Sequence, residues 1–124
     1  YTLDYWKKTA KNIEEMGADS ICIKDMAGLL VPNEATRLVT ALKQATDIPI
    51  ELHTHYTSGV GGMTYLKAVE AGVDIIDTAI SPFAMGTSQP ATEVMAETFR
   101  GTEFDTGFDQ KLFRRDCRLF PPNT

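Results

Sequence analysis

The sequence predicts an α/β fold in which parallel β-strands alternate with α-helices. Short apolar segments, typical of buried strands, are separated by amphipathic segments of about ten to fifteen residues. This spacing favours parallel pairing of the strands through right-handed crossovers. The phrase Met-Gly-Ala-Asp-Ser at residues 16–20 is similar to Ala-Gly-Val-Asp-Ile at residues 71–75, which indicates a repeated βα unit. Three strands and four helices would make about half of a (β/α)8 barrel, and periodicity alone leaves an open doubly wound sheet as the alternative.

Apolar stripes at helical spacing predict helices at residues 3–16, 32–46, 59–71 and 89–99. The first ends at Gly17, because glycine commonly closes a helix. Pro32 opens the second, since proline is tolerated in a first turn. In the third helix, the residues expected to face inward are Met63, Leu66, Ala68 and Val69. Apolar runs at residues 20–23, 50–53 and 73–79 are predicted to be the strands.

Composition excludes several classes of function. The 124 residues have 43% apolar content and a formal net charge of −5, so the chain can form one core and has no basic patch for nucleic acid. No segment approaches the ~20 apolar residues of a membrane span. The two cysteines have neither the number nor the spacing of a disulfide framework, which favours a reducing cytoplasm.

The most informative motif is His53-Thr54-His55, at the end of an apolar strand. Residues two apart point to the same face of a strand, so both imidazoles can reach one divalent metal ion. Lys24 stands at the end of the preceding strand, and chemistry collects at these ends in a parallel barrel. Partial burial there would favour its neutral amine, which adds carbon dioxide to form a carbamate, an oxygen ligand for the metal. For Lys24 taken alone, an ordinary salt bridge to Asp25 or to a neighbour is the favoured alternative.

Other polar residues near the strand ends have simpler interpretations. Asp74 and Asp77 are expected to be loop caps and hydrogen-bond anchors rather than acids. Residues 57–59 and 87–90 are expected to supply helix N-caps, although their side chains can also face a ligand.

Four blocks, in this order, resemble the carboxyltransferase domain of biotin-dependent enzymes: Ile-Lys-Asp-Met-Ala-Gly-Leu-Leu at 23–30, His-Thr-His-Tyr-Thr-Ser-Gly at 53–59, Ala-Gly-Val-Asp-Ile-Ile-Asp-Thr-Ala at 71–79, and Thr-Ser-Gln-Pro at 87–90. The relatives are pyruvate carboxylase, its form in which this domain is a separate subunit, the oxaloacetate decarboxylase α chain and the transcarboxylase 5S subunit. The resemblance covers residues 1–109 and implies a TIM barrel, of which this chain is roughly the second half.

The resemblance also implies a divalent metal, Zn²⁺ or a similar ion, and biotin, as carboxybiotin on a partner domain or subunit. His53, His55 and Lys24 match three of the family's four ligands, two histidines and a carbamylated lysine, so Lys24 is also the candidate catalytic residue. The fourth ligand, an aspartate in an Arg-Asp motif, has no counterpart here. A substrate-binding arginine and the threonine of a Gly-Gly-Gln-x-Thr-Asn motif are also missing. The implied partners are a biotin carrier, pyruvate or oxaloacetate, and further subunits of an oligomer.

Two other functions stay open. A metal-dependent aldolase or acyl-CoA lyase or synthase barrel also uses a His-x-His pair, but usually has Asp-Thr where this sequence has Lys24-Asp25. Alternatively, the chain is an inactive structural remnant that binds metal without turnover.

The last part of the chain, residues 110–124, departs from the family's pattern. It is basic and lacks a clear period. We expect a truncation or a shifted reading frame there, and a genuine lineage-specific terminus is the alternative. In either case we expect poor order from Arg114 onward, because the segment has little apolar surface to bury.

Overall fold

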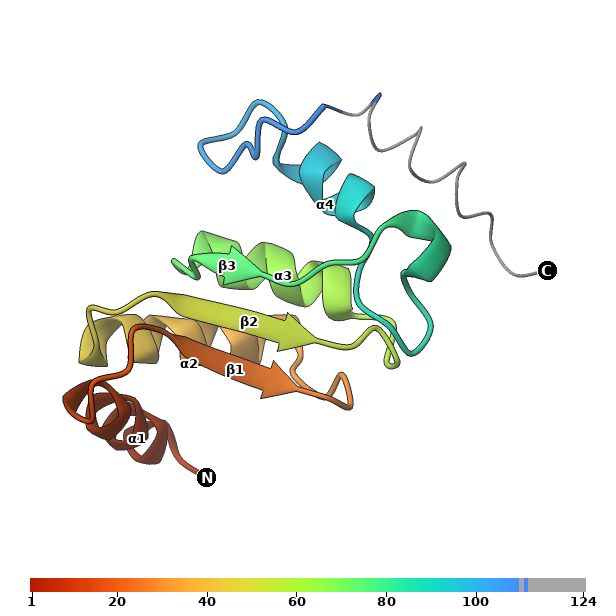
Figure 1. Ribbon diagram of the computed structural model, residues 1–124. Coiled ribbons are helices and arrows are strands. Elements are labelled where there is room, and N and C mark those ends of the chain that lie inside the picture. Colours follow the sequence, from red (N-terminus) through yellow and green to blue (C-terminus); the bar gives the residue numbers. More distant parts are fainter. Residues whose placement is uncertain (110, 112–124) are drawn as a thin grey trace.

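The computed structural model describes residues 1–109 and residue 111. Its elements are α1 (Leu3–Glu15), β1 (Ile21–Asp25), α2 (Pro32–Ala45), β2 (Ile50–Thr54), α3 (Gly61–Glu70), β3 (Ile75–Ile76), the 3₁₀ helix η1 (Ser81–Phe83) and α4 (Thr92–Phe99). Within the described residues, the strands form one parallel sheet in the order β1–β2–β3 (Figure 1). The predicted fold class, parallel strands alternating with helices, is confirmed.

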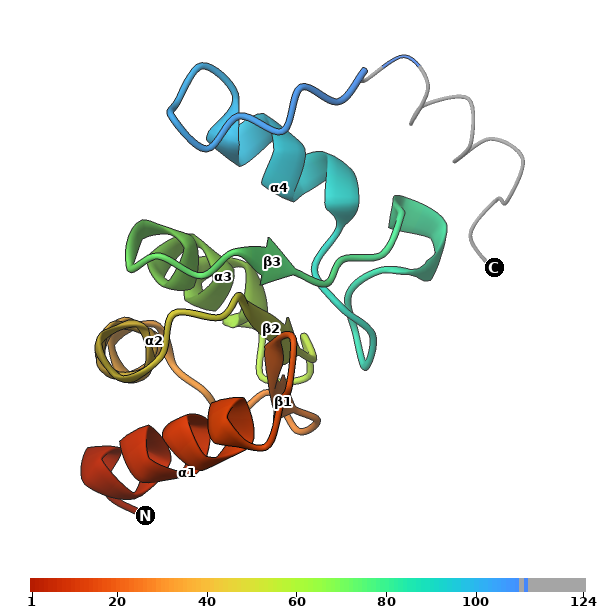
Figure 2. The same cartoon turned by 60° about the vertical axis from the view of Figure 1, so that its left-hand side comes forward.

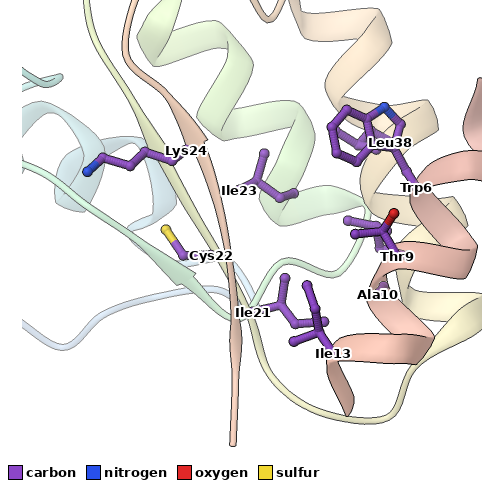
Figure 3. Close-up of a pocket in the computed structure, with 10 residues that line it drawn as sticks. Trp6, Thr9, Ala10, Ile13, Ile21, Cys22, Ile23, Lys24 and Leu38 are labelled. Atoms are coloured by element: carbon purple, nitrogen blue, oxygen red, sulfur yellow. The ribbon is translucent and has the colours of Figure 1, made fainter. Parts of the chain in front are cut away.

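The sheet has one covered face and one open face. The helices α1, α2 and α3 lie on the same side of the strands (Figure 2). Residues paired in register share a face, and the register joins Ile21 to Ile50 and Lys24 to His53. Ile21 and Ile50 are buried on the helix side, whereas Lys24 is exposed on the open face. Figure 3 shows Ile21 and Ile23 pointing toward α1 while Lys24 points away. A complete barrel would turn this open face inward.

The core lies between the helices and the covered face of the sheet. The helix α3 contributes a stripe spaced i, i+3, i+4 and i+7, formed by Gly61, Thr64, Tyr65 and Ala68. The prediction that Met63 faces inward is wrong, because its side chain is 57% exposed and Tyr65 is fully buried instead. The apolar pattern gave the wrong inward face because Gly61 and Thr64 belong to the buried stripe, whereas the apolar Met63 lies outside it.

The repeated phrase forms the same turn at both places. Gly17 and Gly72 have φ of 95° and 111°, a left-handed conformation that favours glycine after a helix. The N–H of Ala18 donates to the Ile13 carbonyl, and the N–H of Val73 donates to the Ala68 carbonyl. Each glycine therefore closes one helix and directs the chain back toward the sheet.

Three elements are clearly shorter than the sequence predicts, among them α3, which spans Gly61–Glu70 instead of residues 59–71. The ladder of β3 comprises Ile75–Ile76 alone, although the flanking N–H groups still donate to carbonyls of β2. The helix α4 begins only at Thr92, because Ala79 and Ala91 form an isolated parallel bridge that keeps the chain extended. None of the helices in the described part of the chain is long and apolar enough to cross a membrane.

We expect the isolated chain to self-associate through the open face and the free edges of its outer strands, which present unpaired backbone groups. Ile75 lies on this face and is 46% exposed. Ile75→Lys should therefore reduce association measured by sedimentation velocity. Met63→Lys is the matched control, since it replaces a 57% exposed side chain on the helix side. A parent chain that stays monomeric and melts cooperatively would contradict this expectation.

Candidate metal centre

The two histidines meet at the C-terminal end of β2. Alternation along the strand places His53 and His55 on the same side, with Thr54 between them buried on the opposite side. Their ring centroids are 5.1 Å apart, and the two Nε2 atoms are 3.2 Å apart. The structure thus brings together the two imidazoles that the motif indicated.

The second nitrogen of each ring, Nδ1, has a hydrogen-bond partner that constrains the tautomer of the ring. His55 Nδ1 lies 2.6 Å from the carbonyl oxygen of Thr87, which can only accept, so Nδ1 carries the proton. His53 Nδ1 lies 2.7 Å from a carboxylate oxygen of Asp77, which accepts in the same way. A neutral ring held in this way carries its lone pair on Nε2, and the two Nε2 atoms are the ring nitrogens that face each other.

This donor set fits a divalent metal ion. Two imidazole nitrogens 3.2 Å apart are held together either by a proton on one of them, which the other accepts, or by a cation that both bind. Nitrogen ligands of tetrahedral Zn²⁺ stand ~2.0–2.1 Å from the metal, which places two of them about 3.3 Å apart. The described residues contain no group of three or more histidine, cysteine, aspartate and glutamate side chains that could hold a metal ion. The described residues therefore add no third histidine, cysteine, aspartate or glutamate side chain to this pair.

Lys24 lies beside the histidine pair but not in the predicted environment. It is paired in register with His53 on the neighbouring strand, and adjacent strands lie about 4.8 Å apart. Its side chain is exposed, so the partial burial expected to favour the neutral amine is not provided by the described residues. The alternative, a salt bridge to Asp25 or to a neighbour, is not found, because Lys24 forms no ion pair within the described part of the chain. Its role as a ligand stays a prediction.

Asp25 instead fixes the loop that follows β1. Its carboxylate accepts hydrogen bonds from the N–H of Leu29 at 3.0 Å, the N–H of Leu30 at 2.8 Å and the hydroxyl of Thr54 at 2.8 Å. Its backbone carbonyl accepts from the N–H of His55 at 3.2 Å. The strand end that carries Lys24 is therefore tied to the strand end that carries the histidines.

These contacts predict a pH-dependent effect of Asp25→Asn. Burial raises the pKa of the Asp25 carboxyl, but the hydrogen bonds from Leu30, Leu29 and Thr54 together lower it below its ordinary value of 3.8. The ionised Asp25 carboxylate therefore stabilises the folded protein fully at pH values above its ordinary pKa. This stabilisation is lost as the pH falls through the lower pKa of the folded state. At pH 7, Asp25→Asn should lower the free energy of unfolding by about 1–3 kcal/mol.

Urea unfolding at pH 7 and at pH 3 measures this difference. The control is Asp19→Asn, because the exposed Asp19 side chain makes no hydrogen bond within the described residues. If Asp25→Asn lowers the free energy of unfolding by the same amount at both pH values, the charge of the Asp25 carboxylate does not contribute to the stability of the loop.

Tyr65 was missed by sequence reasoning, although it holds both strand ends. Its buried hydroxyl donates to the Asp77 carbonyl at 2.6 Å and accepts from the N–H of Thr54 at 3.0 Å. Burial raises the pKa of Tyr65 to about 12, so the hydroxyl stays protonated and keeps donating. The Tyr65 side chain thus fixes both Thr54, which follows His53 on β2, and Asp77, which contacts the His53 ring. Asp77 has the role of hydrogen-bond anchor that we expected.

The two polar turns do not cap helices. The N-cap residues of α3 and α4 are Val60 and Ala91, and neither makes a side-chain cap hydrogen bond, so the predicted capping is wrong. The loop at residues 85–90 faces the histidines instead. It supplies the Thr87 carbonyl to His55 and brings the Gln89 amide nitrogen to 3.3 Å from His55 Nε2.

Fold and site together define a segment of a parallel (β/α) barrel with a histidine pair at its C-terminal strand ends. The chain belongs to the HMGL-like family, whose model matches residues 2–118. This match runs past residue 109, and the predicted boundary and tail at 110–124 lie almost entirely outside the described residues.

Individual relatives agree with the resemblance to carboxyltransferase domains, which is confirmed. A pyruvate carboxylase subunit of Methanocaldococcus jannaschii is 58% identical over 112 residues, 90% of this chain and 20% of that protein. The methylmalonyl-CoA carboxyltransferase 5S subunit of Propionibacterium freudenreichii is 42% identical over 111 residues, 88% of this chain and 22% of that protein. The carboxyl transferase domain of Rhizobium etli pyruvate carboxylase, solved with pyruvate, superposes with a TM-score of 0.91 at 46% identity, over 94% of this chain and 20% of that chain. The chain therefore spans about a fifth of the length of these relatives.

Proposed function

We propose that this chain is the metal-binding segment of a biotin-dependent carboxyltransferase, which moves a carboxyl group between carboxybiotin and pyruvate or oxaloacetate. The observation that carries the proposal is the histidine pair, whose Nε2 atoms lie 3.2 Å apart while both Nδ1 atoms have acceptors. The relatives support the substrate class, since the superposed Rhizobium etli domain was solved with pyruvate.

Within this proposal, His53 and His55 hold the ion through Nε2, and Lys24 contributes an oxygen once it is carbamylated. A divalent ion in this place acts as a Lewis acid that polarises the keto acid and stabilises the negative charge that develops on it. Asp77 and the Thr87 carbonyl keep the imidazoles in the tautomer that leaves Nε2 free. Asp25 and Tyr65 hold the strand ends that carry these ligands.

The remaining parts of the proposed enzyme lie outside this sequence. The aspartate ligand, the substrate-binding arginine and the proton-shuttling threonine that the resemblance implies have no counterparts among the 124 residues. A biotin carrier domain or subunit is the proposed partner, and oligomeric assembly is part of the proposal. A reducing cytoplasm is the proposed compartment, and the free thiol of Cys22 is compatible with it. The segment by itself should therefore show almost no carboxyl transfer.

A segment exchange tests the proposal. The matching 112 residues of the Methanocaldococcus jannaschii protein are replaced by those of this chain. We expect the chimera to decarboxylate oxaloacetate in a biotin-dependent reaction at a rate within about tenfold of the parent. The rate is measured as pyruvate release, and the isolated chain should be nearly inactive in the same assay. The same chimera with His53→Ala is the matched control and should lose activity. An inactive chimera that folds and retains its metal would contradict the proposed function, as would normal turnover by the isolated chain.

A further inference from the structure

The backbone ladder between β2 and β3 ends beside the candidate metal centre. Its last register pair is Leu52 with Ile76, and the N–H of Asp77 donates to the Leu52 carbonyl at 3.2 Å. The hydrogen bonds of a parallel ladder are evenly spaced and run alternately in the two directions. The next bond would therefore run from the N–H of Thr54 to the Asp77 carbonyl.

The hydroxyl of Tyr65 stands in the place of this bond. The N–H of Thr54 donates to the hydroxyl oxygen at 3.0 Å, and the hydroxyl donates to the Asp77 carbonyl at 2.6 Å. The hydroxyl has one proton, and its contact with the Thr54 carbonyl, at 3.5 Å, is too long to compete for that proton. Two hydrogen bonds in series thus replace a single backbone bond of about 2.9 Å and keep the two strand ends further apart.

The Tyr65 side chain is held firmly enough to set this separation. It is fully buried in the stripe of α3 that packs against the sheet. In the same stripe, the Thr64 hydroxyl donates to the Leu30 carbonyl at 2.7 Å, which fixes α3 to the loop after β1. Burial raises the pKa of Tyr65 to about 12, so the hydroxyl keeps the proton that it donates. The hydroxyl therefore acts as a fixed spacer between the strands.

This spacing concerns His53 rather than His55. The Asp77 carboxylate lies 2.7 Å from His53 Nδ1, so the position of the Asp77 backbone determines the contact that orients this ring. His55 Nδ1 instead lies 2.6 Å from the carbonyl oxygen of Thr87, which belongs to the loop at residues 85–90. A change in the separation of β2 and β3 should therefore alter the His53 ring and leave the His55 ring in place.

We propose that Tyr65 is a positioning residue of the metal site, whose hydroxyl is inserted in the β2–β3 ladder and sets the distance at which the Asp77 carboxylate meets the His53 ring. The inference rests on the proposed metal site. Without the hydroxyl, the Thr54 N–H reaches the Asp77 carbonyl only if the strand ends close up. Closing the strand ends moves Asp77 relative to His53, and with it the contact that orients the ring.

The imidazole nitrogens of the 124-residue chain test this role without metal. In a chain labelled with ¹⁵N at histidine and kept in a chelator, Tyr65→Phe keeps the buried ring and removes the hydroxyl. The Nδ1 resonance of His53 should shift, whereas that of His55 should not. Tyr5→Phe is the control, since it removes the hydroxyl of a 44% exposed tyrosine on α1 and should leave both resonances unchanged. An unchanged His53 resonance in Tyr65→Phe, or equal shifts of both rings, would overturn the inference and leave the proposed function standing.

A double-mutant cycle tests whether Tyr65 acts through Asp77. Loss of a partner that orients a metal ligand costs about 10- to 100-fold in affinity, and Tyr65 acts one step behind that partner, so Tyr65→Phe should weaken Zn²⁺ binding by about 3- to 10-fold. In the Asp77→Ala background the same substitution should have an effect below about twofold, because the contact that Tyr65 positions is already gone. Equal losses in both backgrounds would show that Tyr65 only stabilises the fold and would overturn the inference. Failure of the parent chain to bind Zn²⁺ would overturn this role and the proposed function together.

A measurement on the unmodified chain does not depend on how the variants fold. The Thr54 amide proton should show nuclear Overhauser cross-peaks to the Tyr65 ring protons next to the hydroxyl, because the hydroxyl oxygen accepts from this amide. A direct Thr54–Asp77 ladder bond would remove this hydroxyl from between the two backbone groups. An assigned Thr54 amide without these cross-peaks would overturn the inserted hydroxyl and leave the proposed function standing.

Discussion

Replacing His53 or His55 with alanine is expected to lower the affinity for Zn²⁺ by more than about 100-fold. Loss of a partner that only orients a ligand already costs 10- to 100-fold, and each of these substitutions removes a direct ligand. Each also removes an Nδ1 donor, from the Asp77 carboxylate in the first case and from the Thr87 carbonyl in the second. Metal content after dialysis, measured by elemental analysis, gives the result for each variant.

Lys24→Ala provides the comparison for these two variants. Its effect should be smaller in the isolated chain, because the exposed Lys24 amine has little surrounding pocket to favour a carbamate. If the isolated variants do not fold, the same positions can be changed in a full-length relative. A relative that keeps its metal after both histidines are replaced would show that the pair is a structural feature.

Gly28→Ala should be the most destabilising of the conservative substitutions in the loops around the site. Gly28 has φ of 66°, and a Cβ atom there would lie 2.5 Å from the carbonyl oxygen of His55. The conformational cost and the clash with backbone together should lower the free energy of unfolding by about 2–4 kcal/mol. Since the clash falls on His55, the variant should also bind Zn²⁺ more weakly.

Gly59→Ala separates the two contributions. Gly59 has φ of 82° in the next loop, but a Cβ atom there would meet nothing within 4 Å, so only the conformational cost of about 1–2 kcal/mol should appear. Urea unfolding of the two variants gives the comparison. Equal losses in both, with unchanged Zn²⁺ binding, would show that the close approach of Gly28 to His55 has no consequence.

Much of the fold was predictable from the sequence, because local signals agreed with the tertiary structure. Pro32 does begin a helix, and Gly17 and Gly72 do end two others. The errors occurred where contacts between residues distant in the sequence determine which side chains are buried. Thr64 and Tyr65 are buried because Thr64 donates to the Leu30 carbonyl and Tyr65 to the Asp77 carbonyl, and neither partner is visible in the pattern of α3 itself.

The candidate site was predictable to the same extent. The spacing of His53 and His55 follows from strand geometry, which a sequence displays directly. The acceptors of their Nδ1 protons are Asp77, 24 residues away from His53, and Thr87, 32 residues away from His55. No local pattern connects residues so distant, and Gln89 stood in a segment that was expected to cap a helix. The exposure of Lys24 follows from its place on the open face of the sheet, which no local pattern around it reveals.

The coordination of the two imidazoles tests the account most directly. In the chain labelled with ¹⁵N at histidine, one equivalent of Zn²⁺ should shift both Nε2 resonances to the range of metal-bound nitrogen. Both Nδ1 atoms should stay protonated, because Asp77 and the Thr87 carbonyl continue to accept from them. Binding through Nδ1, or a shift of only one of the two rings, would contradict a shared metal site at the end of β2.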